Sequence, residues 1–389
     1  MFRRHSVDLL RGLVMVIMAI DHTRDFVHAG AMAFRPDDLA VTTPAIFMTR
    51  WITHFCAPVF IFTAGLGAWF RLEREGSAPA LSRFLWTRGL WLLLLELTVV
   101  RLVFFFSFSF AHPIFLLVFW SIGVSMIVLA LLVRLPYWLT FAISASMVLF
   151  HNLADGIRPE SWGSFAWLWR LMHQQGPVLL DPLVVVGYPL VPWIGVMGLG
   201  FCAGRIYRLP DGERRRVLAW LGLALTVAFV LLRTWNVYGD PRPWAMQASP
   251  VFSVLSFLSA TKYPVSLQFL LMTIGPALLF LAWVDRARPA ERHPLIVFGR
   301  TPMFYFIGHL FVIHVFSIVM IWLRYGAAPF LWTVPPTLGT ARDVFPADYG
   351  WSLGVTYLVT AAVWLTMYPM CLWLMRLKSR TRKAWVSYL

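Results

Sequence analysis

Apolar stretches long enough to cross a membrane recur along almost the whole chain. A transmembrane helix needs about 20 mostly apolar residues, and we expect ten such helices here. They lie at about residues 8–28, 50–70, 86–106, 114–133, 136–152, 183–204, 217–235, 264–284, 296–323 and 351–375. The stretches between them are not low in complexity and contain no recognisable second domain. The pattern predicts an all-α, polytopic membrane helix bundle in which residues 1–389 form a single transmembrane domain.

The composition supports this prediction. The 389 residues are 59% hydrophobic and 13% charged, whereas ordinary globular proteins are about 25% charged. So little polar surface excludes a soluble enzyme, a disordered chain and a secreted disulfide scaffold. The three cysteines stand far apart in apolar stretches, and the H-E-x-x-H, G-x-x-x-x-G-K-[ST] and G-x-S-x-G motifs are missing. We therefore expect no metal site, no nucleotide hydrolysis and no serine hydrolase.

The basic residues are sorted by side of the membrane. The chain has 33 Lys and Arg against 18 Asp and Glu. If the N-terminus lies inside, 22 of the 33 cations fall in inner segments, within residues 3–11, 71–88, 134, 205–216, 286–300 and 376–383. Cytoplasmic segments carry such an excess. Both termini are therefore expected in the cytoplasm, and the positive charge is explained by the bilayer without a nucleic-acid partner.

A cleaved signal peptide is the rival interpretation of the first segment. Arg3-Arg4, an apolar run and Ala31-Met32-Ala33 together imitate one. The charged residues between Asp21 and Asp25 interrupt that arrangement and favour a retained helix.

The first predicted helix is the least apolar of the ten. Arg11 and His22 are eleven residues apart, so they lie within about 20° of one face and about 16 Å apart along the axis. Asp21 and Asp25 flank His22 and are available to orient it and raise its basicity. We expect His22 to be a general base, with His28 as its strongest rival.

Other ionisable residues fall inside predicted helices, where such groups are rare and functional by default. His54 opens the second helix, and His309 lies near the middle of the ninth, so both are further catalytic candidates. Glu96 is a carboxylate deep in an otherwise apolar helix and needs a partner that the sequence does not identify.

Four segments resemble the heparan-α-glucosaminide N-acetyltransferase-like membrane proteins, a transmembrane acyltransferase family with many bacterial members. They are Ser6–Leu13 continuing to Asp21-His22, Trp51–Phe62, Val191–Met197, and Phe298–Pro302 with His309 and His314. The resemblance implies that acetyl-CoA is taken at the cytoplasmic face and that an amino sugar is acetylated on the far side. It also implies a bacterial inner membrane. The chain departs from the family at His22, where eukaryotic members carry Asn, and its next histidine, His28, comes earlier than the family's loop histidine.

The resemblance gives the inner arginines a role. Arginine suits bidentate contacts with phosphates, so we expect Arg11 and Arg300, and also Arg205 in the 205–216 cluster, to bind the phosphates of CoA. A base about 16 Å from Arg11 matches a thioester on a long pantetheine arm. The Trp193 indole N–H and His54 are candidates for stabilising the oxyanion.

Three functions remain open at this point. The first is an acetyl-CoA-dependent acyltransferase that acts on an amino or hydroxyl group of a sugar. The second is a secondary transporter or channel for a small anion, to which the weak similarity between residues 58–71 and 192–205 would belong. The third is a structural or assembly protein. The acceptor, the acyl group and the oligomeric state, a homodimer included, stay open.

Overall fold

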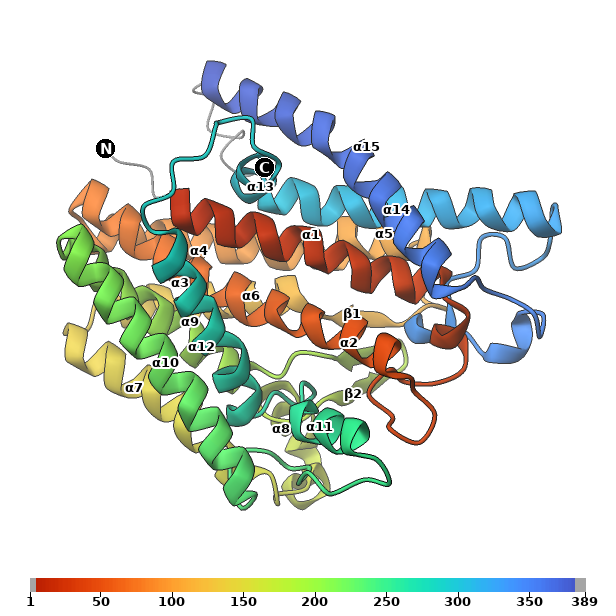
Figure 1. The fold of residues 1–389 in the computed structure, drawn as a ribbon, viewed down its shortest axis with the longest axis horizontal. Coiled ribbons are helices and arrows are strands. Elements are labelled where there is room, and N and C mark those ends of the chain that lie inside the picture. The colour runs from red at the N-terminus through yellow and green to blue at the C-terminus, as the bar shows by residue number, and fades with distance from the viewer. Residues whose placement is uncertain (1–4, 382–389) are drawn as a thin grey trace.

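The structure, a computed structural model, describes residues 5–381, which form the helix bundle in Figure 1. The longer helices are α1 (His5–Val27), α3 (Cys56–Glu75), α4 (Ala78–Leu95), α6 (Val118–Leu132), α7 (Tyr137–Phe150), α9 (Leu190–Ala203), α10 (Asp211–Trp235), α12 (Leu267–Val284), α14 (Pro302–Tyr325) and α15 (Leu353–Arg380). The shorter helices are α2 (Pro44–Ile52), α5 (Arg101–Phe105), α8 (Ala166–Met172), α11 (Pro250–Leu258) and α13 (Pro294–Arg300). Four of the inner cations, Arg3, Arg4, Arg382 and Lys383, lie outside the described residues.

Every predicted span coincides with helix. Within residues 5–381, seven segments are long and apolar enough to cross a membrane: Pro44–Glu75, Tyr137–Ala154, Leu190–Arg208, Asp211–Trp235, Leu267–Val284, Pro302–Tyr325 and Leu353–Arg380. The other three predicted spans fall on the polar helix α1, on α4 with α5, and on α6, which has 15 residues. The prediction of an all-α membrane bundle is confirmed.

Two predicted helices begin too early, because their first residues form strands. A small sheet consists of β1 (Ile114–Leu116), β2 (Gly176–Leu180) and β3 (Leu183–Val186). The central strand β3 pairs in parallel with β1 and antiparallel with β2. Short runs of β-branched residues such as Val184-Val185-Val186 favour strands. They are apolar enough to be mistaken for the start of a buried helix.

The partner of Glu96 is the backbone at the start of α6. Its carboxylate accepts hydrogen bonds from the N–H groups of Leu117, Phe119 and Trp120, at 2.9, 2.9 and 3.2 Å. The first N–H groups of a helix have no partner within the helix and carry partial positive charge. Glu96 therefore holds the junction between β1 and α6 and has a structural role.

The ninth predicted helix is two helices, α13 and α14, with a break at Thr301 (φ −127°, ψ 43°). The residue before a proline is disfavoured in the helical conformation, and Pro302 follows directly. Beside the break, the Arg300 guanidinium pairs with Asp8 of α1 at 3.2 Å. This ion pair ties α13 to the first turns of α1.

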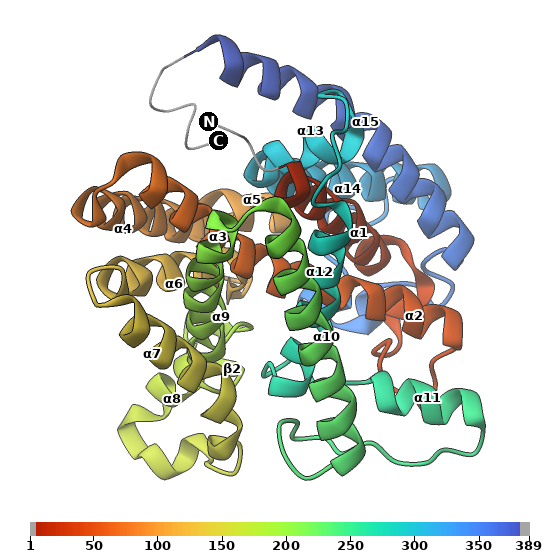
Figure 2. The same cartoon turned by 60° about the vertical axis from the view of Figure 1, so that its left-hand side comes forward.

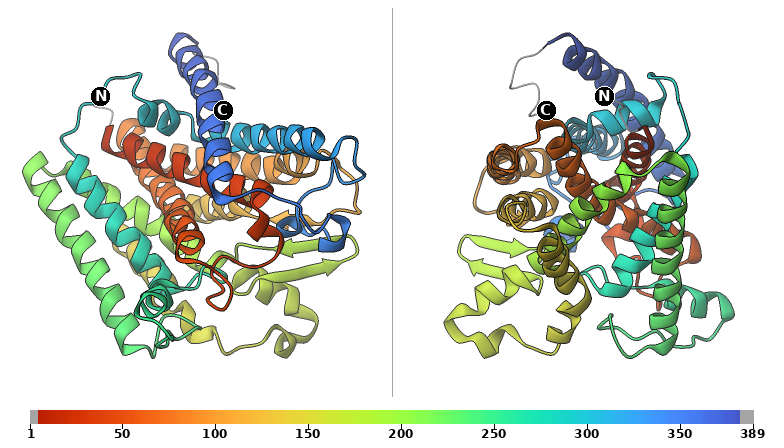
Figure 3. Two further views of the ribbon diagram at one scale, coloured as in Figure 1. Left: turned by 45° about the vertical axis from the view of Figure 1, so that its right-hand side comes forward. Right: turned by 90° about the vertical axis from the view of Figure 1, so that its left-hand side faces the viewer.

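The helices form two groups joined by α3 and α9. Figure 2 shows α4, α6 and α7 on one side and α10 with α12 on the other, with α3 and α9 between them. α15 crosses obliquely over α1 and α14, as Figures 1 and 3 show. Gly65 of α3 faces the Met197 backbone, and Gly200 of α9 faces the Phe62 backbone so closely that a side chain at either position would collide. Close helix packing thus accounts for small residues shared by 58–71 and 192–205.

Candidate active site

A cavity of about 950 Å³ lies among α1, α3, α4, α6 and the start of α14, at the ends that the charge pattern places inside. Its size is in the range of small-molecule sites. Five arginines from separate parts of the chain line it: Arg11, Arg71, Arg74, Arg88 and Arg208. Its apolar lining includes Phe60, Phe84, Leu92, Phe119 and Ile122. An arginine-rich, partly apolar cavity suits a ligand that combines anionic groups with a long uncharged part.

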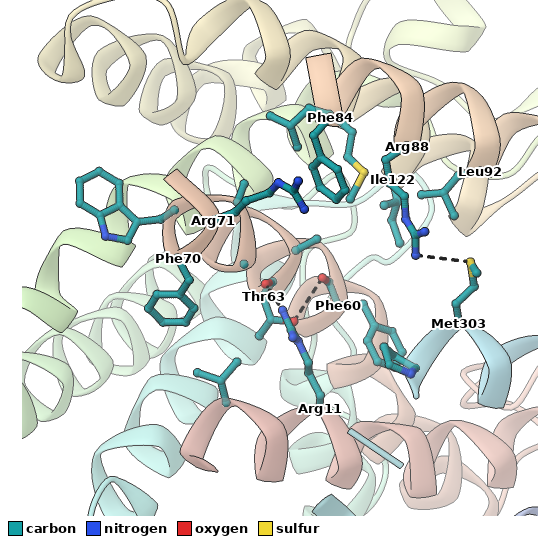
Figure 4. Close-up of a pocket in the computed structure, with 18 of the residues that line it drawn as sticks. Arg11, Phe60, Thr63, Phe70, Arg71, Phe84, Arg88, Leu92, Ile122 and Met303 are labelled. Carbon is teal, nitrogen blue, oxygen red and sulfur yellow. Dashed lines mark hydrogen bonds between the residues drawn. The ribbon is translucent and has the colours of Figure 1, made fainter. Parts of the chain in front are cut away.

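The arginines are held by contacts that fix their direction. Arg11 donates to the carbonyl oxygen of Thr63, and the Arg88 guanidinium lies 3.8 Å from the Met303 sulfur. In Figure 4 these two side chains extend from α1 and α4 into the same space. At the mouth, Arg71 lies 3.7 Å over the Phe84 ring, and Arg208 pairs with Glu73 at 2.5 Å. The positive charge is therefore arranged around the opening before any ligand binds.

Phe306 separates this cavity from a pair of histidines. Its side chain lines the cavity, and its ring lies edge-on to His22, with centroids 6.2 Å apart, and to His309, at 5.8 Å. His22 Nδ1 lies 2.7 Å from His309 Nε2, so the two rings are hydrogen-bonded across α1 and α14. The Phe306 side chain therefore contacts both the cavity and the histidine pair.

The tautomers of both rings follow from one carbonyl group. His309 Nδ1 lies 2.8 Å from the Tyr305 carbonyl oxygen, which only accepts, so Nδ1 carries the proton. His309 Nε2 is then the acceptor, and His22 Nδ1–H is the donor of the bond between the rings. His22 Nε2 is left with its lone pair, which is the form required of a general base.

An ionic cluster lies beside His22 on the outer part of α1. Asp21 pairs with Arg24 at 3.0 Å and with Arg50 of α2, and Arg24 also pairs with Asp25 at 2.6 Å. Both carboxylates that were expected to orient His22 are therefore engaged by arginines. The contact that orients His22 is the one with His309.

His54 and Trp193 lie around this cluster. His54 is buried, with its ring 5.1 Å from Phe269, and the charges of Arg50, Asp21 and Arg24 act on it. Trp193 is fully buried on α9, with its ring 5.6 Å from that of Tyr188. The Tyr188 hydroxyl in turn lies 3.3 Å from that of Tyr263. Contacts through Tyr188 and Tyr263 therefore connect Trp193 with the region of the cluster.

His28 is used as a helix cap. Its Nδ1 accepts a hydrogen bond from the Gly30 backbone N–H at 3.1 Å, at the start of the short helix Ala29–Met32. That lone pair is engaged, so Nε2 carries the proton and the neutral ring has no free basic nitrogen. Burial and the nearby Arg24 charge lower the pKa of His28 and keep the ring neutral. These contacts give His28 a structural role.

Two of the arginines expected to bind phosphates do not line the cavity. Arg300 lies behind Asp8 and pairs with it and with Glu291, and Arg205 lies over the Tyr137 ring at 5.0 Å. Arg208 belongs to the 205–216 cluster considered for phosphate binding, and it does line the cavity. The cavity residues Arg71, Arg74, Arg88 and Phe306 and the cluster residues Arg50 and Lys262 were not predicted from the sequence. The signal for the three cavity arginines was their position at inner helix ends; nothing in the sequence marked Phe306 or Lys262.

A family model described as heparan-alpha-glucosaminide N-acetyltransferase, catalytic, matches residues 3–235. No curated protein matches the chain. The matched part includes α1, α3, α4 and α6, and with them the cavity arginines, His22 and His54. Phe306, His309 and Lys262 lie beyond it.

The cap geometry predicts the behaviour of His28→Asn, since an Asn oxygen can accept from the Gly30 N–H in the same way. Turnover should stay near the native value. The lowered pKa means that the folded protein binds fewer protons than the unfolded chain, whose histidine has a pKa of 6.5, so native stability falls as the pH drops below that value. Unfolding temperatures measured from about pH 8 to about pH 5 should therefore decline less in the variant than in the native protein. Loss of turnover in His28→Asn would return the role of base to His28.

Proposed function

Since the chain belongs to the heparan-alpha-glucosaminide N-acetyltransferase catalytic family, we propose that it is an integral-membrane acyltransferase. It moves an acetyl group from cytoplasmic acetyl-CoA to an amino or hydroxyl group of a sugar or glycan on the periplasmic side. Its place is the inner membrane of a bacterium, in accord with the apolar helices and the charge pattern.

One observation carries the proposal: Phe306, in the wall of the arginine-lined cavity, packs against both rings of the His22–His309 pair. An acyl donor that enters from the inner face and an acceptor that enters from the outer face would meet there. A reaction across the membrane needs this arrangement, because neither substrate then has to cross the bilayer.

The cavity fits acetyl-CoA in its chemistry. Arg71, Arg74 and Arg208 at the mouth suit the phosphates, because guanidinium groups bind phosphate oxygens through paired hydrogen bonds. Arg11 and Arg88, deeper in the cavity, are available to the diphosphate or to the polar amides of the pantetheine arm. Phe119 and Ile122 provide apolar walls for the rest of the arm.

His22 supplies the proton chemistry. The acceptor nitrogen or oxygen attacks the thioester carbonyl carbon while His22 Nε2 takes its proton; the carbon–sulfur bond breaks and CoA leaves as the thiolate. The imidazolium formed on His22 donates through Nδ1 to His309 Nε2, which stabilises the charge. His309 is thus a positioning residue that fixes the tautomer of the base.

Donor binding is tested with two arginines on α4. Arg88→Gln removes a cavity guanidinium and should weaken acetyl-CoA binding by about 10- to 100-fold, the range of hydrogen bonds to charged groups. Arg83→Gln removes an exposed arginine from the same helix and should bind normally. Titration calorimetry of the purified proteins measures both affinities. Equal affinities in the two variants would place the donor elsewhere.

The base is tested with His22→Gln, which keeps an N–H donor for His309 but has no titratable nitrogen. Turnover should fall by about 10²- to 10⁴-fold while acetyl-CoA binds unchanged. The measurement is acetyl transfer from labelled acetyl-CoA to an amino sugar by detergent-purified protein. His309→Gln should lower turnover less and shift the pH profile, because the base remains but loses its fixed tautomer. Near-native turnover in His22→Gln would refute the assignment.

A further inference from the structure

We propose that the outer cluster around Asp21 binds a singly charged anionic group of the acceptor, through Arg24, His54 and Lys262. The inference rests on the proposed function, because it concerns the substrate that reaches His22. It adds that this substrate is an acidic sugar, carrying a carboxylate or an equivalent monoanion.

Two buried side chains of this cluster have nitrogen atoms without a hydrogen-bond partner. Arg24 is 3% exposed, and among residues 5–381 nothing accepts from its Nε and Nη1 atoms; only Nη2 is used, toward Asp21 and Asp25. His54 is 5% exposed, and its Nδ1 likewise has no partner in the described part of the chain. Buried polar groups are normally hydrogen-bonded, so these atoms indicate a partner that is not part of the protein.

Lys262 adds a buried ammonium group to this cluster. It is 8% exposed, and no carboxylate of the described residues lies within ion-pair distance of its ammonium group, which instead lies 5.2 Å from the centre of the Tyr263 ring. Its charge acts on Asp21, His22 and His54. Its chain neighbour Thr261 accepts from Arg242 through its hydroxyl. A buried lysine is rarely left unpaired.

The charges of the cluster leave one positive charge in excess. Arg24, Arg50 and Lys262 stand against Asp21 and Asp25, and His22 and His309 are neutral in the tautomers described above. The positive charge of the cluster also affects Tyr263. Burial acts to raise the pKa of Tyr263, but the Lys262 and Arg50 charges outweigh burial and lower it. One negative charge on a ligand would balance the cluster.

The cluster is partly open to the surface, although the unpartnered atoms of Arg24 and His54 are themselves covered. The side chains of Arg50 and Asp25 are 17% and 24% exposed, and His22 is partly exposed. At the rim, Arg242 pairs with Asp37 at 3.5 Å and donates to the Thr261 hydroxyl, next to Lys262. Arg35, which also pairs with Asp37, is 67% exposed and adds a second cation there. The cations Arg35 and Arg242 at the rim therefore add to the positive charge of the cluster, which favours the approach of an anion.

The carboxylate of Asp240, in the segment before Lys262, is already engaged. Asp240, which accepts from Thr261 and Ser266, faces the buried Arg233 at 3.9 Å. Asp240 is therefore not available to neutralise Lys262.

Binding is tested without the transfer reaction. Glucuronate should raise the unfolding temperature of the purified protein, because a ligand that binds only the folded state stabilises it, and glucose at the same concentration should not. Lys262→Met should abolish the difference and Lys262→Arg should keep it. Arg158→Gln, which removes an exposed arginine from another outer loop, should behave like the native protein. Equal effects of glucuronate and glucose on the native protein would overturn the proposal, even if Lys262→Met fails to fold.

An acetyl-transfer assay then distinguishes a failure of this proposal from a failure of the function on which it rests. With paired acceptors, glucosaminuronate and glucosamine, the native kcat/KM should favour the acid by about 10- to 100-fold, and Lys262→Met should remove that preference. Transfer to both acceptors without preference would refute the acidic acceptor and leave the acyltransferase standing. Stabilisation by glucuronate without transfer to either would keep the anion site and refute the acyltransferase.

Discussion

A hydrogen bond between two histidine rings, His22 on α1 and His309 on α14, connects the two halves of the candidate site. On one side of this bond lies the arginine-lined cavity, with Phe306 in its wall. On the other side lies the ionic cluster of Asp21, Arg24 and Arg50. Since the Tyr305 carbonyl fixes the proton of His309, the bond also fixes which nitrogen of His22 is basic. The position of α14 against α1 therefore determines both the separation of the two compartments and the chemistry available between them.

The charges within the bundle explain how α1 tolerates so many polar residues. A charge in a membrane is expensive unless it is paired. Asp8 pairs with Arg300 near one end of α1, and Asp21 pairs with Arg24 and Arg50 near the other. These pairs also hold α13 and α2 against α1, so the same contacts that satisfy the buried charges position the walls of the site.

The sequence predicts the helices well and the site only in part. Apolar length located the helices, seven of which are long and apolar enough to cross a membrane within residues 5–381. The eleven-residue spacing of Arg11 and His22 placed one in the cavity wall and the other against Phe306. The strands at 114–116 and 183–186 were not predicted, because short apolar runs have no diagnostic period. The break at Thr301 was also not predicted, although Pro302 marks it in the sequence. Lys262, Arg50 and Phe306 come from other helices and a loop, and their approach to α1 is a tertiary property that no local pattern contains. Asp21 and Asp25 looked like partners of His22, but the arginines compete for them more strongly.

The central claim is that an acetyl group passes from one side of the membrane to the other between the cavity and the cluster. It is tested most directly with proteoliposomes that contain acetyl-CoA, labelled in the acetyl group, only in their lumen and an amino sugar only outside. In vesicles whose protein has its inner face toward the lumen, labelled product should accumulate outside while free CoA stays within. Product that forms only when both substrates share one compartment would contradict the account.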